Sequence, residues 1–104
     1  MLEVHIADSF ETAARTSPAF GIDFDLHRAL FHGGAEVTSS CPTLNRIHAD
    51  CTIAGAEIAL LQEEVESLLA TSAPNFPFRP MLVLLRDSCQ TAIQRAHSLF
   101  FLCD

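Results

Sequence analysis

The sequence predicts an α+β domain in which a small sheet, formed by N- and C-terminal strands, packs on one face against about four helices. Residues Leu2 to Asp8 alternate apolar and polar side chains, with the period of a half-buried strand. Residues Ser98 to Asp104 form a nearly continuous apolar run, which is typical of a strand covered on both faces. The two strongest helical patterns precede this run and predict a C-terminal helical hairpin.

The two terminal strands are expected to pair with each other. An apolar run at a free chain end would be poorly hydrated, and the backbone groups of a strand need partners. The alternating N-terminal segment can supply them, in either a parallel or an antiparallel direction. Removal of residues Phe100 to Asp104 is therefore expected to abolish cooperative unfolding.

A short helix is expected after the first strand. Asp8-Ser9-Phe10-Glu11 has the form of a helix start, and the helix extends to Arg15. It ends before Ser17-Pro18, because the residue before a proline avoids the α conformation. Phe20 to Asp23 is expected to be a connection.

A second helix is expected from Leu26 to Phe31. Asp23 or Asp25 can cap its N-terminus, and Gly33-Gly34 supplies the positive φ common at a helix end. Residues 37–40 are expected to form a loop. Another short helix then opens at Pro42, capped by Ser40 or Cys41.

The strongest helical pattern runs from Ile58 to Leu69, where apolar residues recur at steps of three and four. Two prolines break it, and Arg79-Pro80 begins the last helix, which has a wide apolar stripe.

Length and composition predict one domain over residues 1–104. The chain is 49% hydrophobic and 18% charged, which excludes a disordered tail. No apolar run approaches the roughly 20 residues of a membrane span, and the acidic start lacks the basic region of a signal peptide. We therefore expect a cytoplasmic protein whose four cysteines stay reduced and pack as small hydrophobes.

The charge of the chain restricts its partners. The net charge is −7, and six arginines with no lysine face 13 acidic residues. Such a chain cannot build a basic face for nucleic acid, and anionic membranes are disfavoured for the same reason. A basic protein partner fits this charge, and electrostatic steering would speed its association.

The acidic face of the Ile58–Leu69 helix is the best candidate for a binding surface. Glu63, Glu64 and Glu66 lie within four residues, and Glu57 precedes them. The helix contains no basic residue that could pair with them. A solvated face would show the same pattern, and a partner-binding surface is the functional alternative.

Catalysis is not expected, and neither is a cofactor. Cys41 near a helix start could pair with His48, but no orienting acid or oxyanion donor accompanies them. The rival function is a small metal- or ligand-binding domain. His5 is expected to point away from the core, so it could join Asp8 and Asp104 at the strand edge if the strands are parallel. A third possibility is a homodimer that pairs its open sheet edges.

Three stretches carry a family resemblance: Asp23 to Phe31 (DFDLHRALF), Cys41 to Asp50 (CPTLNRIHAD) and the C-terminal FFLCD. With them the chain resembles small bacterial proteins of uncharacterised families, some encoded beside polymorphic toxins and regarded as immunity proteins. The resemblance implies the α+β fold and non-enzymatic binding of a protein. The chain departs from the pattern at residues 54–57, where AGAE replaces a Ser-Pro-x-Glu helix start and lacks its capping hydroxyl.

Overall fold

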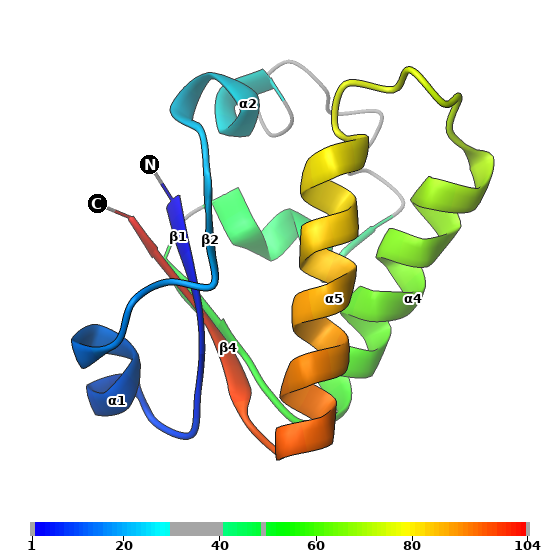
Figure 1. Ribbon diagram of the computed structural model, residues 1–104. Helices are drawn as coiled ribbons and strands as arrows, with labels where there is room; N and C mark the ends of the chain where they lie inside the picture. The colour runs from blue at the N-terminus through cyan, green and yellow to red at the C-terminus, as the bar shows by residue number, and fades with distance from the viewer. Residues whose placement is uncertain (1, 30–40, 49, 104) are drawn as a thin grey trace.

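The predicted α+β architecture is confirmed in a computed structural model, which describes residues 2–29, 41–48 and 50–103. Its sheet has four antiparallel strands in the order β2-β1-β4-β3 (Figure 1). The strands are β1 (Leu2–Ala7), β2 (Phe20–Ile22), β3 (Cys51–Ile53) and β4 (Ser98–Cys103).

The terminal strands pair with each other, as predicted. β1 and β4 run antiparallel along six residues, from Leu2 opposite Cys103 to Ala7 opposite Ser98. β4 also pairs with β3, so it lies inside the sheet, where a continuous apolar run is expected. The sheet is larger than predicted, because β2 and β3 add a strand on each side. β2 lies where the sequence predicted only a connection.

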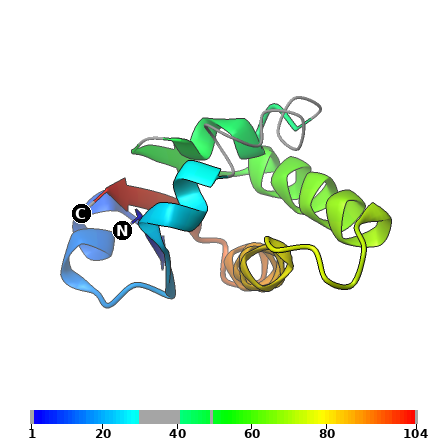
Figure 2. The same ribbon diagram turned by 90° about the horizontal axis from the view of Figure 1, so that it is seen from above.

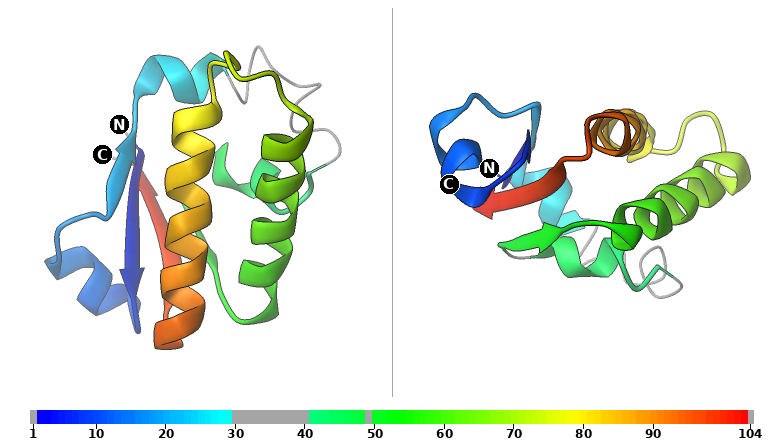
Figure 3. Two further views of the ribbon diagram at one scale, coloured as in Figure 1. Left: turned by 45° about the vertical axis from the view of Figure 1, so that its right-hand side comes forward. Right: turned by 90° about the horizontal axis from the view of Figure 1, so that it is seen from below.

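One face of the sheet carries the main core. Helices α4 (Ala56–Thr71) and α5 (Arg79–Arg95) pack side by side in opposite directions, which confirms the predicted hairpin (Figures 1 and 3). In the view of Figure 2, both helices lie on the same side of the sheet. α5 lies next to β1 and β4, and α4 lies farther from these two strands. Buried side chains from both layers meet there, among them Val4, Leu99 and Phe101 of the sheet and Leu61, Val65, Leu82 and Leu85 of the helices.

The opposite face is covered by α1 (Phe10–Arg15), so the expectation that all helices lie on one face is wrong (Figure 2). Ala13 of α1 packs with Ala7 and Phe100 in a second buried cluster. The Phe10 ring meets the Phe100 ring edge to face, with centroids 6.2 Å apart. Neighbouring residues of β4 therefore bury their side chains on opposite faces.

The short helices begin where polar caps allow. The Ser9 hydroxyl accepts a hydrogen bond from the Thr12 backbone N–H at the start of α1. At the start of α2 (Phe24–Arg28), the Asp23 carboxylate accepts a hydrogen bond from the backbone N–H of Asp25, with 2.8 Å between the nitrogen and the oxygen. The predicted extension of this helix to Phe31, its glycine end and the loop 37–40 lie outside the described residues.

The helix expected at Pro42 is a 3₁₀ helix, η2 (Leu44–His48), which begins two residues after the proline. α4 begins after Gly55, which has a φ of 59° and offers no side-chain cap, in agreement with the missing hydroxyl. α5 ends in Ala96, whose φ of 56° turns the chain into β4. Within the described part of the chain, no helix has the length and apolar character needed to cross a bilayer.

Candidate partner-binding surface on helix α4

Glu64 is the best-anchored acid of the predicted acidic face. One of its carboxylate oxygens accepts hydrogen bonds from the backbone N–H groups of Leu44 at 2.9 Å and Thr43 at 3.1 Å. These N–H groups stand at the start of η2, where helical donors have no partner within the helix. Glu64 therefore holds η2 against α4, and its negative charge meets the positive end of a short helix.

Glu57 is also engaged. It forms an ion pair with Arg46, which η2 contributes. The same guanidinium donates to the backbone carbonyl of Thr52 in β3, 3.0 Å away. β3 pairs only with β4 and is an edge strand, so Arg46 covers one backbone acceptor of the open edge. The basic partner that is missing from the sequence of α4 comes from another element.

Glu63 and Glu66 carry the part of the charge that stays open. Both are exposed, and Glu66 accepts only a hydrogen bond from the amide of Gln62, at 3.3 Å. Glu63 makes no hydrogen bond or ion pair with the described residues. They lie three residues apart and are neighbours on the helix surface. We call Glu57, Glu63, Glu64 and Glu66 together the acidic surface of α4.

A cavity of about 350 Å³ opens beside Glu63 and Glu64. Its volume is at the lower end of the range typical of small-molecule sites. Residues of α4 that are four positions apart line this cavity together, because such residues share one face of a helix. The lining consists of Cys41, Glu63, Glu64, Ser67, Leu68 and Thr71.

The cavity contains groups that accept hydrogen bonds from a cation. Two carboxylates and two hydroxyls line it, and none of its described lining residues is basic. A guanidinium or ammonium group carries only donors, so it complements such a lining. Leu68 adds an apolar wall for the methylene stem of a lysine or arginine.

The residues of the rival metal site do not come together in the described structure. The antiparallel pairing places Asp8 after the end of β1 that lies opposite Ser98, far along β4 from its last residues. Asp104 lies outside the described residues. His5 lies on the face away from the main core, but the expectation that it points outward is wrong, because α1 packs on that face and His5 is only 3% exposed. Its Nε2 lies 3.2 Å from a Glu3 carboxylate oxygen. Among the residues that the structure describes, no three His, Cys, Asp or Glu side chains form a metal site.

The four cysteines are all free. Cys41 and Cys89 are buried as expected of small hydrophobes and Cys51 is half-buried, but Cys103 is exposed, so this expectation is wrong for Cys103. Burial, with a smaller contribution from Glu66, raises the pKa of the Cys89 thiol to about 12. Burial also raises the pKa of Cys51 and Cys103. Cys41 is buried and lies before η2, while the side chain of its proposed partner His48 lies outside the described part. A raised pKa makes Cys89 a packed hydrophobe rather than a nucleophile.

The chain matches no known protein-family model, no curated protein and no solved structure. The sequence located the acidic surface but missed Arg46, Ser67 and Thr71. The four-residue spacing of Glu63, Ser67 and Thr71 is a signal that could have revealed the cavity lining. The role of Arg46 as the ion-pair partner of Glu57 could not be predicted from the sequence, because this pairing depends on how η2 packs against α4.

Proposed function

We propose that this protein acts without catalysis by binding a basic protein partner through the acidic surface of α4, in an immunity-like or regulatory role. The observation that supports this most is the cavity beside Glu63 and Glu64, because the charged side chains among its described lining residues are both acidic. A lysine or arginine of the partner enters this cavity, and its charge is met by both carboxylates.

The distribution of charge supports the same proposal. Arg46 neutralises Glu57 and backbone donors engage Glu64, but Glu63 and Glu66 keep their charge exposed to solvent. The net charge of −7 adds a long-range field that attracts a basic partner. Such surfaces raise the association rate and select the partner by charge complementarity.

The resemblance of the sequence to small uncharacterised bacterial proteins, some regarded as immunity proteins, implies non-enzymatic binding of a protein and supports the same proposal. Here the contact would be centred on Glu63. Glu57 would contribute mainly by holding η2 beside α4, while Glu64 would hold η2 and also face the bound cation.

The test uses charge reversal that spares the internal contacts of the fold. The variant Glu63→Lys plus Glu66→Lys changes two exposed positions and leaves Glu57 and Glu64 in place. The matched control is Asp8→Lys plus Glu11→Lys, two exposed positions beside or in α1, on the other side of the sheet. Both variants change the net charge equally, so any general electrostatic effect is the same in both.

Each immobilised protein is used to capture partners from a lysate of the source organism at low and high salt. We expect the wild type and the α1 control to retain the same basic protein, which high salt releases. The α4 variant loses it. Equal capture by both variants, or capture that does not respond to salt, would refute the proposal.

A further inference from the structure

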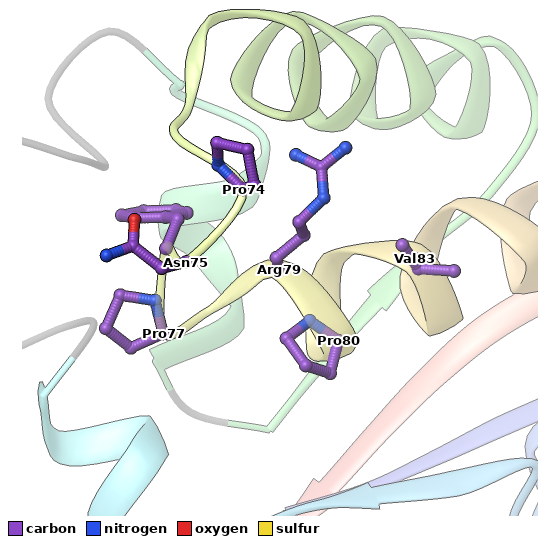
Figure 4. Close-up of a pocket in the computed structure, with 7 residues that line it drawn as sticks. Pro74, Asn75, Pro77, Arg79, Pro80 and Val83 are labelled. Carbon is purple, nitrogen blue, oxygen red and sulfur yellow. The ribbon is translucent and has the colours of Figure 1, made fainter.

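A second cavity lies at the loop end of the helical hairpin, where the chain passes from α4 to α5. It has a volume of about 460 Å³. Figure 4 shows the side chains that line it, with Arg79 extending toward α4. The lining is mostly apolar, and its members are Pro74, Asn75, Phe76, Pro77, Arg79, Pro80 and Val83.

The loop that forms this cavity is held by its own packing. The Phe76 and Phe78 rings meet edge to face with centroids 5.2 Å apart, and Phe78 is buried. The Arg79 backbone N–H donates to the Phe76 carbonyl at 3.1 Å. The prolines restrict the backbone further. The cavity wall is therefore preorganised, which lowers the entropic cost of binding.

Arg79 is fixed in place by two hydrogen bonds. Its Nη1 donates to the Leu69 carbonyl at 3.0 Å and to the Ser72 hydroxyl at 3.3 Å, both at the end of α4. A guanidinium has five N–H donors, and Nη1 carries two of them. The Nε–H and the two Nη2 donors make no hydrogen bond within the described structure. Nε and Nη2 together form an edge that binds a carboxylate with two parallel hydrogen bonds.

Arg79 also lacks a counterion among the described residues, although acids outnumber basic residues about two to one in this chain. Arg46 and Arg86 each form an ion pair with an acid, whereas Arg15, Arg28 and Arg95 share with Arg79 the lack of an ion pair among the described residues. Arg79 is partly buried, and among the described residues no acidic side chain lines its cavity. Of the described lining residues, only Arg79 therefore presents a charge to an anion that enters the cavity.

We propose that this cavity binds a small aromatic monocarboxylate. The carboxylate pairs with the free edge of the Arg79 guanidinium, and the ring packs against Phe76 and the proline rings. The Asn75 amide supplies a further donor at the wall. A single guanidinium balances one negative charge, so a monocarboxylate fits better than a doubly charged phosphate. This proposal is independent of the acidic surface of α4.

The probe is phenylacetate, titrated into ¹⁵N-labelled protein and followed by NMR. Phenylacetamide is the matched neutral probe, because it has the same ring and shape without the charge. We expect phenylacetate to give saturable shifts confined to residues 73–83, with an affinity at least about tenfold above that of the amide.

Two variants test the role of Arg79. Arg79→Lys keeps the charge but loses the planar fork, and it should weaken binding of phenylacetate at least about tenfold. Pro80→Glu places a negative charge in the cavity wall and leaves the contacts of Arg79 with α4 intact. It is tolerated at the start of a helix, where acids are favourable, and it should also abolish binding.

Arg86→Gln is the control, because Arg86 is on the same helix and does not line the cavity. It should bind phenylacetate as the wild type does. Equal affinity for the acid and the amide, absence of saturable shifts, or full affinity in Pro80→Glu would overturn the proposal.

Discussion

The Glu64 carboxylate accepts a hydrogen bond from the backbone N–H of Leu44, 2.9 Å away, across 20 positions of sequence. This contact joins the middle of α4 to the start of η2. It places Cys41, which lies just before η2, beside the acidic turns of α4, and the cavity opens between them. Glu64, one acid of the predicted binding surface, thus fixes the position of η2 relative to α4, and the cavity depends on this arrangement.

Replacement of Glu64 tests this positioning role. We expect Glu64→Ala to lower the free energy of unfolding by about 1–2 kcal/mol, because two backbone donors lose a charged acceptor. Glu64→Gln keeps an acceptor oxygen and should cost less. The neighbouring change Glu63→Ala should have almost no effect. Urea denaturation measures all three, and equal stability of the Glu64→Ala and Glu63→Ala proteins would contradict the assignment.

Phe101 should be among the most costly residues to truncate. It is fully buried in the main core, on the central strand β4. We expect Phe101→Ala to reduce the free energy of unfolding by about 3–5 kcal/mol. Leu102→Ala, at a half-buried position of the same strand, should cost about 1 kcal/mol. Similar losses at the two positions, measured by thermal or urea unfolding, would mean that β4 is not packed as described.

Asp50 should make stability depend on pH in the acid range. Its carboxylate accepts a hydrogen bond from the Cys103 backbone N–H at 2.6 Å. This bond, with a smaller contribution from the Cys103 side chain, lowers the pKa of Asp50 below its ordinary value of 3.8. The folded state therefore favours the ionised form. The resulting stabilisation is complete above 3.8 and is lost as the pH falls through the lowered pKa.

The measurement compares wild type with Asp50→Asn by denaturation as a function of pH. We expect the wild type to be more stable at neutral pH and the difference to disappear in strong acid. An NMR titration of the Asp50 carboxyl in the folded protein gives the pKa directly. A midpoint at or above 3.8 would show that the contact with Cys103 does not favour the charge.

Ala96 offers a site for stabilisation. Its φ of 56° lies in the left-handed region, which strains a residue with a Cβ atom. Ala96→Gly should therefore raise the free energy of unfolding by about 0.5–1 kcal/mol. Gly55 has a φ of 59°, and Gly55→Ala should do the opposite although open space surrounds the added Cβ. A destabilised Ala96→Gly protein would contradict the assigned end of α5.

The long elements could be predicted because their patterns are local. β1 alternates along six residues, and α4 and α5 repeat their apolar side chains over several turns. The strands β2 and β3 have three residues each, too few to establish a period of two. They form because β1 and β4 offer unpaired backbone groups on their outer sides.

The burial of His5 and the internal use of Glu57 and Glu64 could not be predicted from sequence. His5 was expected to point outward, but α1 covers the face on which it lies and buries the side chain. The two glutamates find their donors at η2, which lies outside α4 and is separated from it along the chain by β3. These contacts depend on tertiary packing, whereas the open charge of Glu63 could be read from the composition of α4 alone.

The most direct test of the proposed function is a calorimetric titration of the captured basic partner into the wild type and into Glu63→Lys plus Glu66→Lys. The Asp8→Lys plus Glu11→Lys protein serves as the charge-matched control. Binding by an acidic surface on α4 predicts that the α4 variant loses at least about tenfold in affinity, or about 1.4 kcal/mol, while the control loses much less. Equal affinities for the two variants would contradict it.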